Sequence, residues 1–315
     1  MEKNIATRVD VSLVKEKSLF SKNKLSLLLF LGPFLLFFVI FHVTPLLGGL
    51  FISFTDFPLL GEVTFVGLEN YMKAFKDPLF HKSLINTFAY VIGIIPLFVL
   101  SMLAALSIQK ANKGRRFFQV ILFLPYIIPM AVNGFIFSFM YMPNNGVLGG
   151  ILRFLGFEEQ ANIGLLTQPS TALVAVVFVW VYIHLGYIMS ILYNGLEEIP
   201  SSYYEAAKID GAGKIRTFFQ ITLPLLSNVL LYVVVTSFIL AFQIFPLVWI
   251  LTGSGMGEGA GGPAASTISL DLYIYQSAFR DQALGYASAL GVLMLIVTFL
   301  IALIPFKSFK EVTYD

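Results

Sequence analysis

The chain has 315 residues, of which 57% are hydrophobic, 15% aromatic and only 12% charged. Soluble domains carry about 25% charged residues, so this composition excludes a soluble globular protein and indicates an integral membrane protein. The net charge of +2 gives no reason to expect a nucleic-acid partner, and without cysteine the chain forms neither a disulfide nor a thiolate metal site.

Six apolar stretches lack Asp, Glu, Lys and Arg, and each is long enough to cross a bilayer, which takes about 20 residues of helix. The first is much longer than the apolar core of a signal peptide, so we expect it to remain as a span. We predict an all-α membrane protein with six transmembrane helices, an N-terminal tail (residues 1–24), a membrane domain (25–306) and a C-terminal tail (307–315). The six stretches are Leu25–Thr55, Ser83–Gln109, Phe117–Tyr141, Pro169–Asn194, Ile221–Thr252 and Ala283–Phe306.

The lysines and arginines between these stretches are distributed unequally. Fifteen lie in the two tails, in the segment around residues 110–116 and in the segment around residues 208–216, whereas the other loops hold five. Cytoplasmic loops carry the excess of Lys and Arg. We therefore expect a multi-pass protein with both termini and the 208–216 segment in the cytoplasm.

Two prolines four residues apart, Pro125 and Pro129, interrupt the third stretch. Such a helix breaks unless neighbouring groups satisfy the freed backbone. We interpret the break as part of a transport pathway or of a helix interface, and the residues alone leave both open.

A polar loop (residues 194–224) separates the fourth and fifth stretches. Ser202 and Glu205 have the spacing of a capping box, which predicts a short helix from Tyr203 that ends at Gly211. A second short helix is expected from Gly213 to the Leu223–Pro224 pair, where proline disfavours the α conformation of the preceding residue. Small side chains let a partner approach closely, so the loop is either a docking element or simply a well-capped turn.

The loop resembles the cytoplasmic EAA loop of inner-membrane permease subunits of binding-protein-dependent ABC importers. The residues that carry the resemblance are Glu205-Ala206-Ala207, Asp210-Gly211 and Ile221-Thr222-Leu223-Pro224. Further segments are similar to the carbohydrate-uptake group, which includes the maltose, glycerol-3-phosphate and raffinose systems, so that the resemblance covers most of residues 28–305. These segments are SFTD (53–56), FVGLENY (65–71), NTFAY (86–90) and LGYASAL (284–290).

The resemblance implies a type I ABC importer permease fold in the bacterial cytoplasmic membrane and names the partners. These are a second homologous permease, two cytoplasmic ATPase subunits, an extracytoplasmic solute-binding protein, membrane lipid and a carbohydrate substrate. It assigns coupling to the ATPase to Glu205, Ala206, Ala207, Asp210 and Gly211. ATP and Mg²⁺ would be bound by the ATPases, and this chain, which lacks a GxxxxGK[ST] motif, would hold no cofactor or metal and would not be an enzyme.

An ion-coupled secondary transporter is the alternative, although its usual intramembrane charges are missing, and a structural scaffold protein is a third interpretation. A neutral sugar is bound by hydrogen bonds and ring stacking, so polar and aromatic side chains within the spans are pathway candidates. Each has an alternative role in helix packing. The candidates are Asn133, Trp180, Tyr182, Tyr187, Asn228, Thr236 and Gln243.

Overall fold

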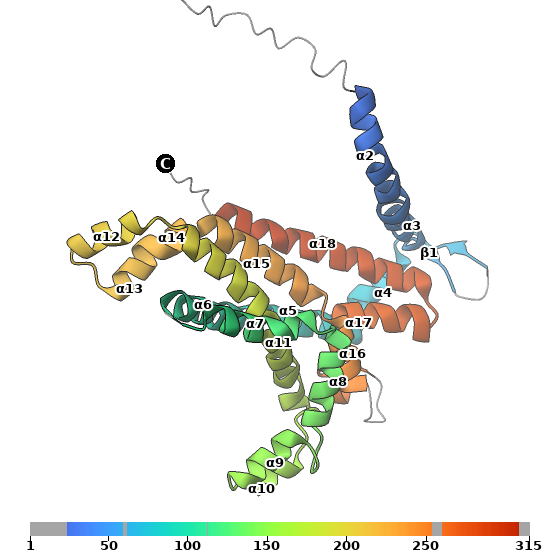
Figure 1. The fold of residues 1–315 in the computed structure, drawn as a ribbon. Coiled ribbons are helices and arrows are strands. Elements are labelled where there is room, and N and C mark those ends of the chain that lie inside the picture. The colour runs from blue at the N-terminus through green and yellow to red at the C-terminus, as the bar shows by residue number, and fades with distance from the viewer. Residues whose placement is uncertain (1–23, 59–61, 112, 254–259, 309–315) are drawn as a thin grey trace, which may run out of the picture. The chain divides into compact units, whose positions relative to one another are not determined.

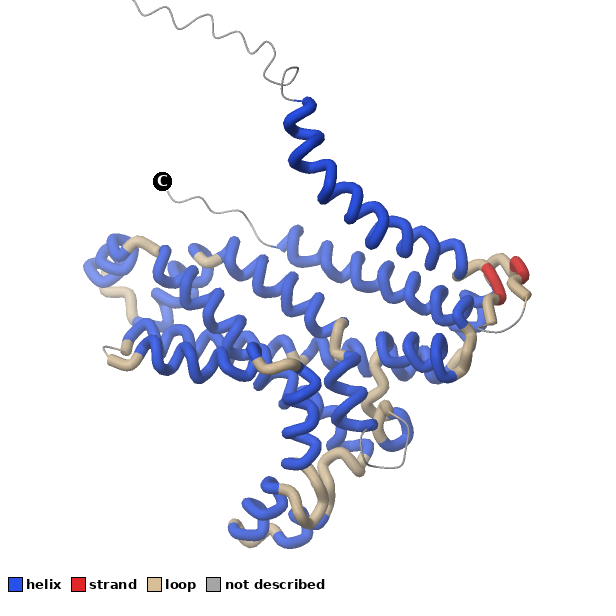
Figure 2. Tube along the Cα trace, turned by 45° about the vertical axis from the view of Figure 1, so that its right-hand side comes forward, coloured by secondary structure: helices blue, strands red, loops and turns tan. Residues whose placement is uncertain are grey.

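The computed structural model describes residues 24–58, 62–111, 113–253 and 260–308, and the chain divides into two units, residues 1–51 and 52–315. The described residues are predominantly helical, with one pair of two-residue strands (Figure 2). Apart from Lys24, Lys307 and Ser308, which belong to helices, the predicted tails lie outside the described residues.

The first unit contains the first predicted span. Helix α2 (Lys24–Phe38) continues through a π-helical turn, η1 (Val39–Val43), into α3 (Thr44–Ile52). Both the backbone N–H and the hydroxyl of Thr44 donate to the Val39 carbonyl. This wider turn lies just ahead of Pro45, whose nitrogen cannot donate a hydrogen bond. The extra room in the backbone lets the helix continue through the proline.

The second unit begins with a small antiparallel pair, β1 and β2, and continues as helices (Figure 1). Its elements are β1 (Thr55–Asp56), β2 (Thr64–Phe65), α4 (Glu69–Lys76), α5 (Pro78–Ile92), α6 (Ile94–Lys110), α7 (Arg115–Ile127), α8 (Met130–Met140), α9 (Val147–Phe154), α10 (Glu158–Asn162), α11 (Pro169–Glu198), α12 (Ser201–Ile209), α13 (Lys214–Thr217), the π-helix η2 (Phe218–Thr222), α14 (Leu223–Leu225), α15 (Ser227–Phe242), α16 (Phe245–Gly253), the 3₁₀-helix η3 (Pro263–Ala265), α17 (Leu270–Tyr275), the π-helix η4 (Gln276–Arg280) and α18 (Leu284–Ser308).

Four helices of the described residues are long and apolar enough to cross a membrane, and two bent helix pairs bring the number of candidate spans to six. The long helices match the first, second, fourth and sixth predicted stretches. The bent pairs match the third and fifth. The four long helices cover Leu29–Ile52, Pro78–Lys110, Pro169–Glu198 and Leu284–Pro305.

The third span breaks between α7 and α8, which meet at 94°. Ile128, the residue before Pro129, is extended rather than helical (φ −67°, ψ 131°), as expected before a proline. The side-chain amide of Asn133 donates to the Pro125 and Ile128 carbonyls at 3.0 and 3.1 Å. One buried amide thus satisfies two carbonyl groups at the break.

The fifth predicted span is present as a bent helix pair. The chain bends by 75° at Leu226, between the segment Lys214–Leu225 and α15, and breaks again between α15 and α16. At the second break the N–H of Phe245 donates to the carboxylate of Asp271 at 2.6 Å. A side chain from a later part of the chain therefore replaces the helical bond that is lost beside Pro246.

The centre of the second unit is the crossing of α11 with α6 and α7. A Cβ atom added to Gly186 on α11 would lie 1.9 Å from the carbonyl oxygen of Leu122 on α7. On the α6 side, the hydroxyl of Ser101 donates to the Leu185 carbonyl at 3.0 Å. The two helices therefore approach α11 closely enough to allow only glycine at residue 186.

The NTFAY segment of α5 holds the chain that precedes α17. The amide of Asn86 donates to the Ala265 and Ile268 carbonyls at 3.1 and 2.9 Å, and the hydroxyl of Tyr90 donates to the Thr267 carbonyl at 2.7 Å. The hydroxyl of Thr87 accepts the N–H of Leu270 at 2.9 Å. Three side chains of one motif thus satisfy the backbone of a non-helical segment far away in sequence.

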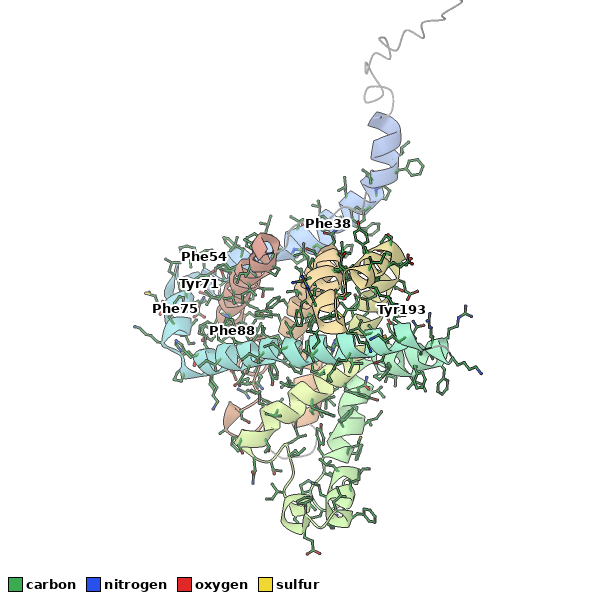
Figure 3. All side chains as sticks on the ribbon, turned by 90° about the vertical axis from the view of Figure 1, so that its left-hand side faces the viewer. Phe38, Phe54, Tyr71, Phe75, Phe88 and Tyr193 are labelled. Carbon is green, nitrogen blue, oxygen red and sulfur yellow. The ribbon has the colours of Figure 1, made fainter. Side chains whose placement is uncertain are left out.

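The SFTD and FVGLENY segments are joined in the same way. The amide of Asn70 donates to the Ser53 and Thr55 carbonyls at 3.0 and 2.8 Å, and the Ser53 and Tyr71 hydroxyls lie 2.6 Å apart. The ring of Tyr71 also packs on Phe54, with centroids 5.6 Å apart (Figure 3). These contacts fix α4 against the chain that enters β1.

Asp77, which caps α5, connects this region to the C-terminal helices. Its carboxylate accepts the N–H of Leu79 at 2.8 Å, the hydroxyl of Tyr286 at 2.6 Å and the hydroxyl of Tyr273. Burial raises the pKa of Asp77, but these hydrogen bonds outweigh it and hold the pKa below its ordinary value. Burial and the neighbouring Asp77 raise the pKa of Tyr273 to about 12.

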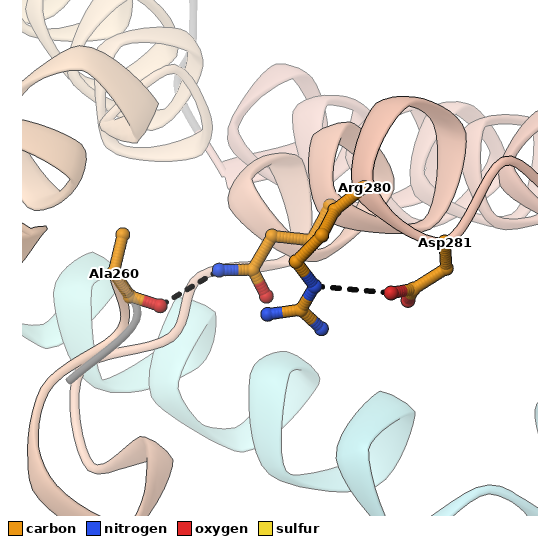
Figure 4. Close-up of polar contacts among 4 residues, drawn as sticks. Ala260, Arg280 and Asp281 are labelled. Carbon is orange, nitrogen blue, oxygen red and sulfur yellow. Dashed lines mark hydrogen bonds and ion pairs between the residues drawn. The ribbon is translucent and has the colours of Figure 1, made fainter.

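The end of η4 carries an ion pair at the protein surface. Arg280 and Asp281 are adjacent in sequence and mostly exposed, with 3.0 Å between nitrogen and oxygen (Figure 4). An exposed pair of this type contributes about 0–1 kcal/mol. The nearby bond from the Gln276 amide to the Ala260 carbonyl, at 2.7 Å, fixes the chain that leads into η3.

Replacing Gly186 by alanine is expected to prevent α7 and α11 from packing. The added carbon would overlap a backbone oxygen, so we expect a loss of more than about 3 kcal/mol. The yield of monodisperse protein and its unfolding temperature in detergent measure this effect. Gly291→Ala is the matched control, because a Cβ there meets nothing within 4 Å; equal behaviour of the two variants would contradict the close crossing.

The carboxylate of Asp77 is expected to stabilise the fold in a pH-dependent way. Its folded pKa lies below the unfolded value of about 3.9, so its contribution is complete above that value and is lost as the pH falls through the folded pKa. Asp77→Asn should cost about 1–2 kcal/mol at pH 7, measured by thermal unfolding between pH 3 and pH 8. The exposed Asp56, changed to Asn, should leave the curve unchanged.

Candidate functional site

The polar loop begins with α12, which starts two residues earlier than predicted. The predicted capping box was wrong, because Pro200 occupies the N-cap position and no side chain caps the helix. Pro200 has an extended ψ of 136°, and its carbonyl accepts the N–H of Tyr203 at 3.3 Å. Its fixed φ therefore directs the chain into the helix from Ser201 onward.

Two faces of α12 have different roles. Ala207 is buried, and Tyr204 points toward the rest of the loop, where its hydroxyl lies 3.4 Å from that of Thr222. Ala206 is exposed on another face together with Ile209, three residues later, whose side chain is 86% exposed. Ala206 and Ile209 therefore form a small exposed apolar surface on this face of α12.

The five residues of the predicted coupling contact divide between these faces. Glu205, Ala206, Asp210 and Gly211 are exposed, whereas Ala207 packs inward. Ile209 was not among the predicted residues, although its position at i+3 from Ala206 places it on the same helix face. We name the exposed set Glu205, Ala206, Ile209, Asp210 and Gly211 the α12 surface.

Gly211 ends α12 as predicted. Its φ is +72°, in the left-handed region that favours glycine. The N–H of Gly211 donates to the Lys208 carbonyl at 3.2 Å, and the N–H of Ala212 donates to the Ala207 carbonyl at 2.9 Å. This pair of bonds is the Schellman arrangement, so the elbow of the loop is a hydrogen-bonded turn.

The second short helix begins after Gly213, as predicted, but it does not end at Leu223–Pro224. Leu223 stays helical (φ −64°, ψ −45°), and the chain continues from α13 through η2 into α14. In η2 the N–H of Leu223 donates to the Phe218 carbonyl, five residues back. The π-helical turn widens the backbone ahead of Pro224 and so accommodates the proline; the chain bends only at Leu226.

Three of the predicted pathway residues lie away from the others. Asn133 is buried and serves the α7–α8 break. Trp180 is buried in the core, and its indole N–H has no hydrogen-bond partner in the described part of the chain. Tyr182 is exposed, but it packs against Phe137 (centroids 5.3 Å) on a different face of α11 from Tyr187.

A row of rings leads from this core to the surface. The rings of Trp180 and His184 have centroids 4.9 Å apart, and Tyr126 lies 5.9 Å from His184. Tyr126 stacks on Tyr187 at 4.5 Å with an interplanar angle of 10°, and the hydroxyls of Tyr187 and Tyr232 are 3.3 Å apart. Tyr187 is half-buried and Tyr232 exposed, so the row ends in two accessible phenols.

The remaining candidates extend this row along α15. Asn228, Tyr232, Thr236 and Gln243 fall within an arc of about 80° at 100° per residue, and Asn228, Tyr232 and Gln243 are exposed while Thr236 is half-buried. Tyr232 was missed, although it lies four residues from both Asn228 and Thr236. Tyr126 was missed as well, because only the tertiary structure brings it to Tyr187. We name these six residues the tyrosine face: Tyr126, Tyr187, Asn228, Tyr232, Thr236 and Gln243.

Gln243 stands at the α15–α16 break, which Asp271 holds in place. Besides the N–H of Phe245, the Asp271 carboxylate accepts the N–H of Leu272 at 2.8 Å and the hydroxyl of Ser269. Burial raises the pKa of Asp271 above its ordinary value, against the lowering effect of these bonds. The carboxylate thus accepts three hydrogen bonds, and the one from Phe245 holds the backbone of the break next to Gln243.

Residues 97–307 match a family model described as the inner membrane component of binding-protein-dependent transport systems. The chain is 33% identical over 306 residues to the arabinooligosaccharides transport system permease protein AraP of Bacillus subtilis, covering 93% of this chain and 92% of that protein. It is 32% identical over 291 residues to the diacetylchitobiose uptake system permease protein NgcF of Streptomyces coelicolor, covering 89% and 80%.

The fold is similar to that of a chain in the crystal structure of a bacterial ABC transporter involved in the import of the acidic polysaccharide alginate. The TM-score is 0.77 at 21% identity, and the match covers 91% of this chain and 96% of that chain.

Proposed function

Because this chain belongs to the family of inner membrane components of binding-protein-dependent transport systems, we propose that it forms half of a translocation pathway for a sugar or oligosaccharide. The other half is a second, homologous permease. Family membership makes the chain a multi-pass transmembrane subunit of an ABC importer and decides against the ion-coupled carrier and the scaffold protein.

The tyrosine face supports a carbohydrate as the substrate. Sugars are bound by ring stacking together with hydrogen bonds to hydroxyl and amide groups, and the tyrosine face offers both kinds of group. The relatives named for arabinooligosaccharide transport and diacetylchitobiose uptake support the same class. The carbohydrate arrives from an extracytoplasmic solute-binding protein, which passes it to the pathway.

The α12 surface supports coupling to a cytoplasmic ATPase. The excess of lysine and arginine in this loop and in both tails supports a cytoplasmic position for all three. A short helix with an exposed isoleucine and a hydrogen-bonded glycine turn would fit a cleft on a partner. Each of two ATPase subunits receives one permease in this arrangement, and the ATPases bind ATP and Mg²⁺.

In the proposed mechanism, α11 transmits movement from the α12 surface to the tyrosine face. When the ATPases close on ATP, the α12 surfaces move with them, and each permease rocks as a body about the interface with the other. The tyrosine face is thereby opened to one side of the membrane and then to the other. The main observation that supports this proposal is the exposure of Ile209 beside Ala206 on α12, which ends in the hydrogen-bonded turn at Gly211.

Replacing Ile209 by glutamate is expected to uncouple the permease from its ATPase. A charge would enter the docking cleft in place of an apolar side chain whose burial contributes about 2–3 kcal/mol, so affinity should fall at least about thirtyfold. Co-purification of the ATPase and ATP-dependent uptake measure the loss. Ile163→Glu is the matched control, because Ile163 is an exposed isoleucine in the loop between α8 and α11. Normal co-purification with Ile209→Glu would refute the docking proposal.

Replacing Tyr187 by alanine is expected to lower the amount of sugar moved per ATP hydrolysed by at least about tenfold, because stacking and a hydrogen bond are both lost. Tyr187→Phe keeps the ring and should lose about threefold to tenfold. Uptake and ATP hydrolysis are measured together in reconstituted vesicles. Phe178→Ala removes an exposed ring from the opposite face of α11; if it impaired transport as much as Tyr187→Ala does, the tyrosine face would not be the pathway.

A further inference from the structure

An apolar groove of about 760 Å³ lies between α6 and the segment α13–η2–α14. Phe98, Met102 and Leu106 line it from α6, and Phe218 lines it from η2. Uncharged polar side chains along the groove have hydrogen-bond partners within the protein. The Gln109 amide donates to the Leu196 carbonyl at 3.3 Å, and the Tyr204 hydroxyl lies 3.4 Å from that of Thr222. The groove interior therefore suits a hydrocarbon ligand.

Two cations stand at the edge of this groove. Lys110 and Lys214 both line it, and both are exposed. Neither has an ion-pair partner in the part of the chain that the structure describes. Lys110 is also the last residue of the span Pro78–Lys110, so the lysines lie where the hydrocarbon layer meets the headgroups.

We propose that this groove binds an anionic phospholipid, with an acyl chain along α6 and the phosphate between Lys110 and Lys214. Basic pockets between membrane helices at a bilayer boundary bind acidic lipid headgroups, and charge complementarity selects the phosphate over an apolar helix of another protein. The site does not depend on the docking role of α12. Because Phe218 and Leu223 belong to the same continuous helical segment as Lys214, a bound lipid braces the second half of the polar loop.

The test uses the complete importer in vesicles of phosphatidylcholine and phosphatidylglycerol with a trace of phosphatidylglycerol that carries a diazirine on its acyl chain. After illumination, the labelled peptides are mapped. We expect labels on α6 and on residues 214–223. Removing one lysine (Lys110→Gln) should lower this labelling about fivefold, and removing both (Lys110→Gln with Lys214→Gln) about thirtyfold.

Lys113→Gln with Arg116→Gln is the matched control, because it removes two nearby cations, one before α7 and one in its first turn, that do not line the groove. Labelling of the groove should then stay within about twofold of the original, since at least about fivefold is expected for a contacting cation. Equal labelling by a phosphatidylcholine probe would overturn the proposal, since it would indicate unselective lipid contact.

A second measurement tests whether protein fills the groove instead. The chain has no cysteine, so Leu103→Cys places a single thiol at the groove. We expect this thiol to react with a lipid-soluble maleimide in the assembled importer. Capture of a helix from the second permease, or of the first span of this chain, by a short photoactivatable cross-linker attached to this thiol would identify a protein interface and overturn the lipid proposal.

Discussion

The structure depends on one constraint: inside a bilayer every backbone N–H and C=O group needs a partner from the protein. The helices meet it internally, but this chain interrupts them at several places. At two of the breaks a polar side chain supplies the missing partner: Asn133 between α7 and α8, and Asp271 between α15 and α16. The π-helical turns ahead of Pro45 and Pro224 solve the same problem by widening the backbone.

This constraint also explains the short motifs that resemble the carbohydrate-uptake permeases outside the polar loop. In NTFAY, the side chains of Asn86, Thr87 and Tyr90 bind the backbone of residues 267–270, where the chain enters α17. In FVGLENY, Asn70 binds the backbone of SFTD. These motifs hold segments of the fold together.

The two proposed functional surfaces lie near opposite ends of one stretch of chain, in which only Ile199 and Pro200 separate α11 from α12. Helix α11 carries Tyr187 and runs without interruption to Glu198, directly before α12. At 1.5 Å per residue this distance is about 16 Å of rigid helix. The close crossing at Gly186 fixes α11 against α7, which carries Tyr126 on the opposite side of the stacked ring pair. In the proposed mechanism, this packing would carry a displacement of α12 to the tyrosine face.

The sequence by itself determined the membrane class, the six candidate spans and the Gly211 turn, because apolar length and left-handed glycine geometry are local properties. The match of the polar loop to the EAA pattern also led to the family. Only the tertiary structure decided the break of the fifth span, the start of α12 and the helical path through Pro224, since partners such as Asp271 lie far away in sequence. It likewise separated Asn133, Trp180 and Tyr182 from Tyr187 and brought Tyr126 and Tyr232 to it, because a side chain's neighbours depend on how helices pack.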